Sequence, residues 1–362
     1  MEILKTLSEL VNIDSSQNCD KIIDYIKERL LGEVEEILEV ENKKCLLVGI
    51  NTKLKNQNVI VLSGHIDTVN PSSQNQFNVR VENNNAYGLG IIDMKCFTST
   101  IIDQIKELRK IDFPIVCVFT TDEETKLETV EIAIEKLKEL NIKPVFSIIG
   151  EPSNMNFAIR SKGCYDYKLE VFGKACHSSK PQFGINSIYI ISKVITFIEK
   201  LTKSYTETTL NCGVISGGDI VNRVPEYAKL NFDIRTYDEN EKQVVVDKIQ
   251  NFIKDLEKEY SGSKIELSNI VALPSFNLKN KSLIEKISEK LNNNLEDFSG
   301  GCEAGYFTSY AGDAVIYGIG DTSLCHQPNE NIEIDKYKDY QNKLLLCIKE
   351  IVACLNQKLI LT

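Results

Sequence analysis

The sequence predicts an α/β protein with a doubly wound domain, built on a mostly parallel central sheet, and an inserted ferredoxin-like α+β domain. Three observations support this. Strand-like and helix-like segments alternate up to about Gly163, the order of elements changes after that residue, and the alternation returns from about Ser275. We therefore expect one discontinuous domain formed by residues 1–163 and 273–362, and an inserted domain formed by residues 164–272.

The first domain shows the two periodicities that distinguish amphipathic helices from buried strands. In a helix expected over residues 19–31, Ile22, Ile26 and Leu30 share one face, and Gly32 ends the helix. Further helices are expected over residues 98–110 and 129–140. Short apolar runs, typical of buried parallel strands, occur at residues 44–48, 59–62, 115–119 and 145–149.

The inserted domain and the end of the chain complete the prediction. Residues 165–171 alternate between apolar and polar side chains, as a half-exposed strand does. The inserted elements follow the order β-α-β-β-α-β, with strands at 165–171, 210–216, 228–235 and 264–267 and helices at 186–203 and 240–260. The doubly wound pattern then resumes, with a helix at 283–292, a strand at 314–319 and a helix at 337–355.

Composition and charge exclude several classes of partner. A net charge of -10 and a pI near 5.1 leave no broad basic surface for nucleic acid or anionic membrane. No apolar run approaches the ~18–20 residues of a membrane span. The eleven cysteines are scattered, without a CxxC pair and without an export signal in the chain. We expect a cytoplasmic protein with reduced thiols that acts on a small molecule.

Potential metal ligands stand at or just after the ends of four expected strands, and ligand sites in open α/β sheets collect at this edge. A further carboxylate lies in the glycine-containing loop 88–95, which can reach the same edge. The residues are His65, the adjacent pair Glu123 and Glu124, Glu151, His326 and, in the loop, Asp93.

Two histidines and three carboxylates form a ligand set typical of paired zinc ions, with one carboxylate bridging the metals. Three carboxylates against two dications leave a net positive charge, which a bridging hydroxide neutralises. One member of the Glu123 and Glu124 pair can bind metal while the other stays free as a general base. In the His-x-Asp sequence, the Asp67 carboxylate can accept the second imidazole N–H of His65 and fix its tautomer.

Each of these residues also has a purely structural interpretation. A histidine at a strand end is commonly hydrogen-bonded within the fold, and Asp-Glu-Glu is commonly a solvated turn. Asp93 could cap the next helix, and Glu151 with Pro152 could form a turn. The joint arrangement at successive strand ends favours the metal site. His177 belongs to the inserted domain, so it is better placed to contact substrate than to bind the same metals.

The chain resembles a family of di-zinc hydrolases that includes acetylornithine deacetylase, succinyl-diaminopimelate desuccinylase, aminoacylase and glutamate carboxypeptidase. The likeness spans nearly the whole chain and is strongest to acetylornithine deacetylase, for example at residues 149–152, 217–219 and 302–304. The matching motifs, in chain order, are residues 63–69, 93–95, 122–124, 150–152, 177–179, 222–225, 233–235 and 326–330.

This resemblance implies two Zn²⁺ per subunit, which Co²⁺ can replace. It also implies that Glu123 is the general base and that Asp67 orients His65. The implied metal ligands are His65 and Glu151 on one ion, Glu124 and His326 on the other, and Asp93 on both.

The resemblance further implies that the inserted domain is a lid and the dimerisation domain of a homodimer. The partner subunit's His177 and the lid residue Asn222 would stabilise the oxyanion. Arg235 would bind the substrate α-carboxylate, although a salt bridge on the lid surface is its alternative role. Glu303 would face the side-chain ammonium of the substrate.

The implied reaction removes the acetyl group from N-acetyl-L-ornithine, a step of arginine biosynthesis, by attack of a zinc-bound hydroxide. Alternatives are a succinyl-diaminopimelate desuccinylase, another N-acyl amino acid hydrolase or a dipeptidase of the same family. The substrates of a desuccinylase or a dipeptidase would require a cation where Glu303 is expected. A non-catalytic binding protein is disfavoured, because candidates for all five ligands and the base are present. The family usually has a glycine where this chain has Cys96, and a glycine-containing turn where it has residues 126–129. These differences concern how the substrate fits more than how the metals bind.

Overall fold

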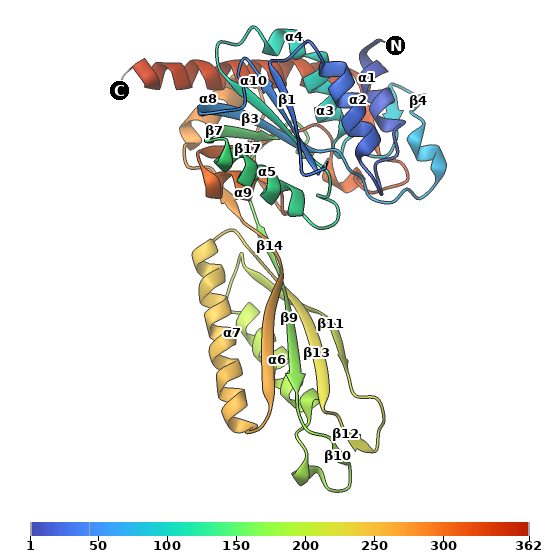
Figure 1. The fold of residues 1–362 in the computed structure, drawn as a ribbon, viewed down its shortest axis with the longest axis vertical. Coiled ribbons are helices and arrows are strands. Elements are labelled where there is room, and N and C mark those ends of the chain that lie inside the picture. The colour runs from blue at the N-terminus through green and yellow to red at the C-terminus, as the bar shows by residue number, and fades with distance from the viewer. Residues whose placement is uncertain (1, 43, 361–362) are drawn as a thin grey trace. The chain divides into compact units, whose positions relative to one another are not determined.

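The structure, a computed structural model, describes residues 2–42 and 44–360. It divides the chain into two compact units (Figure 1). Unit 1 is formed by Met1–Ser161, Phe276–Phe298 and Cys302–Thr362, and unit 2 by Lys162–Ser275 with Ser299–Gly301. Among the described residues, no helix is long and apolar enough to cross a membrane.

In the described part of the chain, unit 1 is built on a nine-stranded sheet in the order β1-β2-β6-β3-β7-β17-β8-β15, with β16 beside β8. The four strands from β6 to β17 are parallel at its centre, and antiparallel pairs flank them. This confirms the predicted α/β fold with a large central sheet of mostly parallel strands. The strands are β1 (Glu36–Val40), β2 (Cys45–Ile50), β3 (Gln57–His65), β6 (Ile115–Thr120), β7 (Ile142–Ile149), β8 (Phe157–Ser161), β15 (Phe276–Asn277), β16 (Leu295–Phe298) and β17 (Asp313–Ile316).

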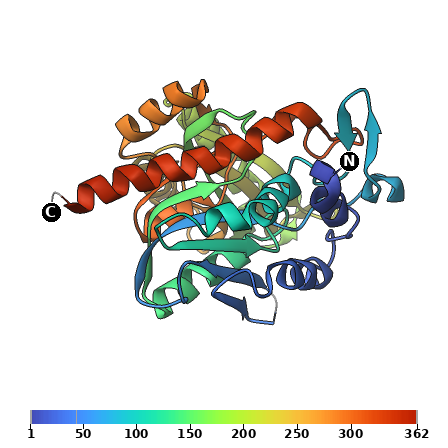
Figure 2. The ribbon, with the colours of Figure 1, turned by 90° about the horizontal axis from the view of Figure 1, so that it is seen from above.

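Helices cover both faces of this sheet, because successive side chains of a strand point to opposite faces. Ile60 and Leu62 of β3 pack with α2, α3, α8 and α10 on one face, whereas Val59 and Val61 pack with α5 and α9 on the other. Figure 2 shows α10 lying across the first face, beside α8. The helices are α1 (Lys5–Val11), α2 (Asp20–Leu30), α3 (Lys95–Asp103), α4 (Ile105–Leu108), α5 (Glu128–Glu139), α8 (Lys281–Leu291), α9 (Ala304–Tyr310) and α10 (Ile334–Ile360).

A small sheet in the order β18-β5-β4 joins two distant parts of the chain. β5 (Asn85–Tyr87) leads into the loop that carries Asp93, and β18 (Asn331–Glu333) follows the loop that carries His326. Their antiparallel pairing therefore brings the two loops together. The third strand is β4 (Arg80–Glu82).

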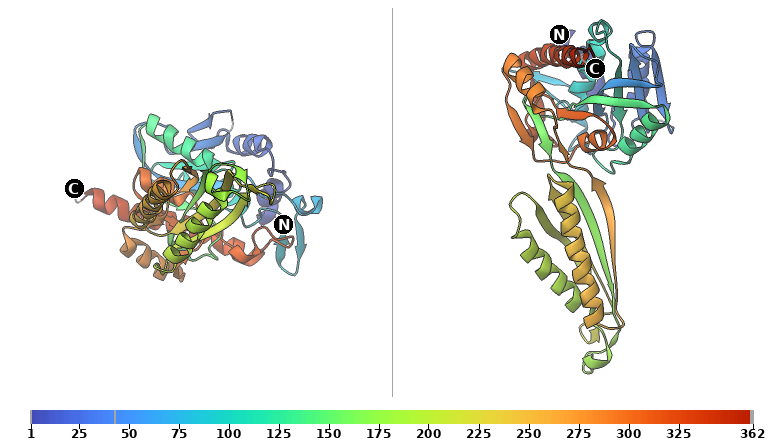
Figure 3. Two further views of the ribbon diagram at one scale, coloured as in Figure 1. Left: turned by 90° about the horizontal axis from the view of Figure 1, so that it is seen from below. Right: turned by 90° about the vertical axis from the view of Figure 1, so that its left-hand side faces the viewer.

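Unit 2 has a four-stranded antiparallel sheet in the order β11-β13-β9-β14. Both of its long helices pack on one face (Figure 3), around a core that includes Leu169, Ile191 and Ile249. The chain order β9-α6-β11-β13-α7-β14 is the β-α-β-β-α-β order expected from the sequence. These elements are β9 (Gly163–Phe172), α6 (Ser187–Thr202), β11 (Thr209–Gly217), β13 (Tyr227–Thr236), α7 (Glu239–Glu259) and β14 (Lys264–Leu273), with a short pair of β10 (Cys176–His177) and β12 (Arg223–Val224).

Some elements of unit 1 differ from their predicted bounds. The helix expected over residues 98–110 begins earlier, at Lys95, and is divided into α3 and α4. The strand expected over residues 314–319 ends at Ile316, before the loop that contains Gly318 and Gly320. The short helix α9 was not predicted.

Candidate metal centre and active site

The carboxyl ends of the central parallel strands carry the candidate ligands of unit 1. His65 is the last residue of β3, opposite the last residue of β6, Thr120. Glu123 and Glu124 follow β6, and Glu151 follows β7 after a single glycine. Because parallel strands end at the same edge of a sheet, these side chains converge there.

Asp93 lies between the two histidines of unit 1. Its Oδ1 is 3.0 Å from Nε2 of His65, and its Oδ2 is 3.3 Å from Nε2 of His326. The same Nε2 of His326 is 2.8 Å from Oε1 of Glu124. Each Asp93 oxygen thus faces a different histidine, which is the arrangement that a carboxylate needs to bridge two cations.

Glu123 and Glu151 also lie close to His65. One ligand atom from each of these three residues lies within 4.8 Å of the others, and the same holds for His65, Asp93 and Glu124. Oε1 of Glu151 is buried and has no hydrogen-bond partner among the described residues. A buried carboxylate oxygen without a donor is unfavourable unless a cation compensates it. The donor set and this oxygen fit a pair of divalent metal ions.

The pKa shifts at this edge of the sheet reflect the crowding of buried charge. Burial raises the pKa of Glu151 well above its usual value, and repulsion from Glu123 and Asp93 adds to the effect. Burial also raises the pKa of Glu123 to about 8, with a further contribution from Glu124. For Asp93, burial acts in the same direction, but hydrogen bonds to His326 and His65 outweigh it and lower the pKa.

The two histidines beside Asp93 also have raised pKa values, but hydrogen bonds to carboxylates are the cause. Burial disfavours the charged form of His65, but hydrogen bonds to Asp67 and Asp93 outweigh it and raise its pKa well above the usual value. Hydrogen bonds to Asp93 and Glu124 raise the pKa of His326 to about 10. Since an imidazole must be neutral to bind metal, metal binding here releases protons.

Asp67 connects the metal centre to the turn that carries the two glutamates. Nδ1 of His65 is 3.1 Å from the carbonyl oxygen of Asp67 and 3.5 Å from its Oδ1, so the carbonyl is the nearer acceptor. The carboxylate accepts the backbone N–H groups of Glu123 at 3.3 Å and Glu124 at 3.1 Å. Asp67 therefore orients His65 and also fixes the turn after β6.

Two buried charged residues support the Asp93 loop, and the sequence analysis gave neither of them a role. Glu330 is 2% exposed, and its carboxylate accepts the N–H groups of Gly90, Ile92 and Asp93 at 3.0, 2.9 and 3.3 Å. Burial raises its pKa to about 7. Lys95 is fully buried and donates from Nζ to a backbone carbonyl at 2.9 Å. For Glu330, the available signal was its place in the motif that begins at His326.

Glu303 lies at the start of α9 and is 1% exposed. Its Oε2 accepts a hydrogen bond from Ser63 Oγ at 2.8 Å, and its Oε1 accepts one from Thr120 Oγ1. Both oxygens are therefore engaged by hydroxyl groups at the ends of β3 and β6. A contact between Glu303 and a substrate ammonium stays a prediction.

The remaining predicted site residues belong to unit 2, whereas the metal centre lies in unit 1. His177 is exposed in β10, and its Nδ1 is 2.8 Å from Ser179 Oγ. The carbonyl oxygen of Asn222 accepts the N–H of Ser178 at 3.0 Å. Arg235 on β13 contacts Asp233 at 3.1 Å, which is a salt bridge of the kind named as its alternative role. The substrate roles of His177, Asn222 and Arg235 stay predictions.

Comparisons with known proteins agree with this geometry. Residues 61–350 match the profile of peptidase family M20/M25/M40. An uncharacterised metallohydrolase of Methanocaldococcus jannaschii is 30% identical over 93% of this chain and 94% of its own length. Acetylornithine deacetylases are also 30% identical, in Buchnera aphidicola over 76% of both chains and in Aliivibrio salmonicida over 83% of this chain and 82% of the relative.

Solved structures share the fold. A tripeptidase from Staphylococcus aureus has a TM-score of 0.78 and 22% identity, over 97% of this chain and 98% of its own. A Bacillus subtilis protein, described as a dinuclear metal-binding peptidase of the M20 family, has a TM-score of 0.74 and 15% identity, with the same coverage of both chains. The motifs, the metal-ligand geometry and the family match lead to one conclusion: the chain belongs to peptidase family M20/M25/M40 and is a metal-dependent amidohydrolase or peptidase.

Proposed function

We propose that the protein removes the acetyl group from N-acetyl-L-ornithine, with two zinc ions and Glu123 as the general base. The observation that carries the proposal is that the carboxylates of the adjacent residues Glu123 and Glu124 have different neighbours. The Glu124 carboxylate faces His326, whereas the Glu123 carboxylate lies in the group formed with His65 and Glu151. The choice of acetylornithine is supported by the curated relatives of that name.

The contacts described above support the metal ligands that the resemblance implies. His65 and Glu151 would hold one ion, Glu124 and His326 the other, and Asp93 both. When bound, the two Zn²⁺ ions polarise the acyl carbonyl and lower the pKa of water, and Co²⁺ should support the same chemistry.

Glu123 has the position of a base, because its carboxylate lies beside the candidate ligands His65 and Glu151. Without metal ions, burial and repulsion from Glu124 raise its pKa to about 8, and a carboxylate at this position is placed to take a proton from the attacking water. Water adds to the acyl carbon, the C–N bond breaks, and Glu123 delivers the proton to the leaving amine. The products are acetate and ornithine.

Residues of unit 2 would complete the site in a homodimer. The partner subunit's His177, together with Asn222, would stabilise the oxyanion, and Arg235 would contact the substrate carboxylate. The homodimer is supported by β11, an edge strand whose Val214 and Ile215 are more than half exposed. Exposed apolar edge strands commonly pair with another chain.

A cytoplasmic location is supported by the cysteines, all of which are free thiols.

The test compares substrates side by side. We would measure kcat/KM of the zinc-reconstituted protein on N-acetylornithine, succinyl-diaminopimelate, a neutral dipeptide and a tripeptide. The expected result is a preference of more than about tenfold for N-acetylornithine, or ~1.4 kcal/mol of transition-state discrimination. A preference for succinyl-diaminopimelate or for a peptide would overturn the proposal and assign the chain to another activity of the same family.

A further inference from the structure

Glu303 is a buried carboxylate at the carboxyl edge of the central sheet, close to the metal centre but outside its candidate ligand set. It precedes α9, yet in the described part of the chain its side chain makes no capping hydrogen bond to that helix. Its two oxygens instead accept hydrogen bonds from Ser63 Oγ, at 2.8 Å, and from Thr120 Oγ1. Glu303 is 1% exposed, and both hydroxyl groups belong to fully buried residues. One carboxylate therefore holds two hydroxyl groups away from solvent.

Strand periodicity explains how these side chains meet. Successive side chains of a strand point to opposite faces of the sheet. Ser63 and His65 therefore lie on the same face of β3 as Val61, which is the face covered by α5 and α9. Thr120 is the residue opposite His65 in the pair of β3 and β6. This face is apolar along the strands and polar at their carboxyl ends, where the carboxylate at the start of α9 meets it.

Ser63 connects Glu303 to the strand end that carries Glu151. The carbonyl oxygen of Ser63 accepts the N–H of Gly150 at 3.0 Å, and Gly150 directly precedes Glu151. Ser63 is also the partner of Ile149, the last residue of β7. Glu303 holds the Ser63 side chain, and Ser63 holds the backbone before Glu151, so the position of this ligand depends on Glu303.

Thr120 connects Glu303 to His65 in the same way. The carbonyl oxygen of Thr120 accepts the N–H of Ile66 at 2.9 Å, and Ile66 directly follows His65. Each connection thus consists of one hydroxyl group and one backbone hydrogen bond. The two residues reached, His65 and Glu151, are the pair assigned above to the same ion.

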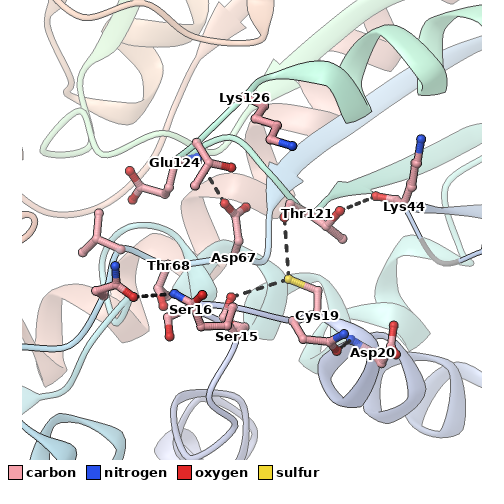
Figure 4. A pocket seen from close by; sticks show the side chains of 15 residues that line it. Ser15, Ser16, Cys19, Asp20, Lys44, Asp67, Thr68, Thr121, Glu124 and Lys126 are labelled. Carbon is pink, nitrogen blue, oxygen red and sulfur yellow. Dashed lines mark hydrogen bonds between the residues drawn. The ribbon is translucent and has the colours of Figure 1, made fainter.

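The turn after β6, which carries Glu124, has supports of its own. Figure 4 shows this turn beside a cavity of about 490 Å³. Thr121 Oγ1 donates to the carbonyl oxygen of Lys44, and the Asp67 carboxylate accepts the N–H of Glu124 at 3.1 Å. Loss of Glu303 should therefore leave the ion on the Glu124 side largely in place.

We propose that Glu303 is a positioning residue for one of the two metal ions, and that it acts through Ser63 and Thr120 on the strand ends that carry Glu151 and His65. The inference rests on the metal pair of the proposed function, but not on its substrate. It replaces the expected contact with a substrate ammonium. Both oxygens of the carboxylate are already bonded, and a residue that is 1% exposed has no surface for an ammonium group.

The test measures zinc affinity by competition with a chelator, for the wild type, Glu303→Ala, Glu303→Gln and the matched control Asp313→Ala. Asp313 is also a buried carboxylate of unit 1, and it accepts the N–H groups of Lys279 at 3.0 Å and Asn280 at 2.9 Å. It begins β17, so it lies at the opposite edge of the sheet from the metal centre. A thermal melt shows whether each variant is folded.

The wild type should bind two ions. Glu303→Ala should weaken one of them by about 10–100-fold, the range typical of residues that orient metal ligands, and change the other by less than about threefold. Glu303→Gln should lose less affinity than Glu303→Ala, because a hydroxyl group can donate to the amide oxygen and accept from the amide N–H. Asp313→Ala should bind both ions as the wild type does. With Co²⁺ in place of zinc, only Glu303→Ala and Glu303→Gln should alter the visible spectrum, which depends on ligand geometry.

Ser63→Ala and Thr120→Val test the same connections from the other side. Each variant removes one hydroxyl group and should weaken the same ion by a smaller factor than Glu303→Ala. These two variants also decide the question if Glu303→Ala does not fold. Wild-type affinity for both ions in both of them would overturn the positioning role.

Kinetics at saturating zinc separate the positioning role from a substrate contact. N-acetyl-L-norvaline lacks the side-chain ammonium of N-acetyl-L-ornithine, so Glu303→Gln should lower kcat/KM by the same factor for both. A loss confined to N-acetylornithine would overturn the proposal, and so would equal zinc affinities for Glu303→Ala and Asp313→Ala. If the wild type hydrolyses neither substrate, the proposed function fails, and the zinc titration still tests Glu303.

Discussion

Glu123 and Glu124 are neighbours in sequence but differ in chemical environment. Both N–H groups donate to the Asp67 carboxylate, which fixes the turn, while the two side chains face different partners. A substitution at either position therefore tests a separate function, and each serves as the control for the other.

We predict that Glu123→Gln lowers kcat by roughly 10²–10⁴ and leaves the metal content near that of the wild type, because the amide keeps the shape but accepts no proton. Glu124→Gln should instead lower the metal content, with activity partly restored by excess Zn²⁺. Steady-state kinetics and elemental analysis measure both. Near-normal turnover of Glu123→Gln would remove this residue as the base.

The carboxyl ends of parallel strands lie at the same edge of a sheet. His65 and Glu151 lie at or just after such ends, so the sequence alone could place these two candidate ligands together. It placed Lys95 and Glu330 within matching motifs but gave neither a role, because the burial of their charges appears only in the folded chain. It also did not distinguish the carbonyl of Asp67 from its carboxylate as the acceptor for His65.

The pairing of β5 with β18 fixes the Asp93 loop relative to the His326 loop. Glu330 precedes β18 and adds a local contact, since its carboxylate accepts three N–H groups of the loop that follows β5. The strand pairing and the Glu330 carboxylate together therefore fix the position of Asp93.

We predict that Glu330→Gln weakens metal binding by roughly 10–100-fold, the range typical of residues that position metal ligands. The amide presents only one acceptor oxygen to N–H groups that now contact two. A chelator-competition titration measures the affinity. Glu333→Gln on β18 is the matched control, because Glu333 pairs with Lys336 at the surface. Equal affinities for Glu330→Gln and the control would reject the positioning role.

Long amphipathic helices such as α2 and α7 were predictable, because an apolar stripe at helical spacing is a strong signal. The helix α9 was not, because Ala304–Tyr310 is short and contains a glycine and residues of low helix propensity. Its formation depends on tertiary packing, since Ala304 and Phe307 are buried in the core beneath the sheet.

At the scale of the whole molecule, the proposed homodimer makes activity depend on association. We predict that Ile215→Glu on β11 converts a dimer to a monomer and lowers kcat strongly, because a charge on an apolar edge strand prevents pairing. Light scattering and kinetics measure the two effects. Val244→Glu, at an exposed apolar position on α7, is the control. A stable dimer of Ile215→Glu would exclude this edge as the interface.

Metal removal should act on unit 1 alone, because the buried carboxylates and the two candidate histidine ligands all belong to it. Ligand binding at 1,000 times the dissociation constant stabilises a folded state by about 4 kcal/mol. We predict that a chelator lowers the melting transition of unit 1 by several degrees and leaves that of unit 2 unchanged, as scanning calorimetry would show. A melting profile insensitive to the chelator would argue against structural metal binding.

The order of strands and helices was predictable at this scale because the β-α alternation and the β-α-β-β-α-β segment have distinct periodicities. Strand order was not, since β17 pairs with β7 although all of unit 2 lies between these two strands in sequence. Pairing of this kind depends on long-range packing that no local pattern reports.

The late position of β17 has a consequence during protein synthesis. β17 occupies the place between β7 and β8, and the residues that follow it supply His326 and Glu330. A nascent chain that ends before Asp313 therefore has an unfilled gap in its sheet, and Asp93 has only one of its two neighbouring histidines. If the metal pair binds as proposed, the second ion is fully coordinated only after His326 has been made, and until β17 is added the incomplete sheet exposes unpaired strand edges of the kind that favour aggregation.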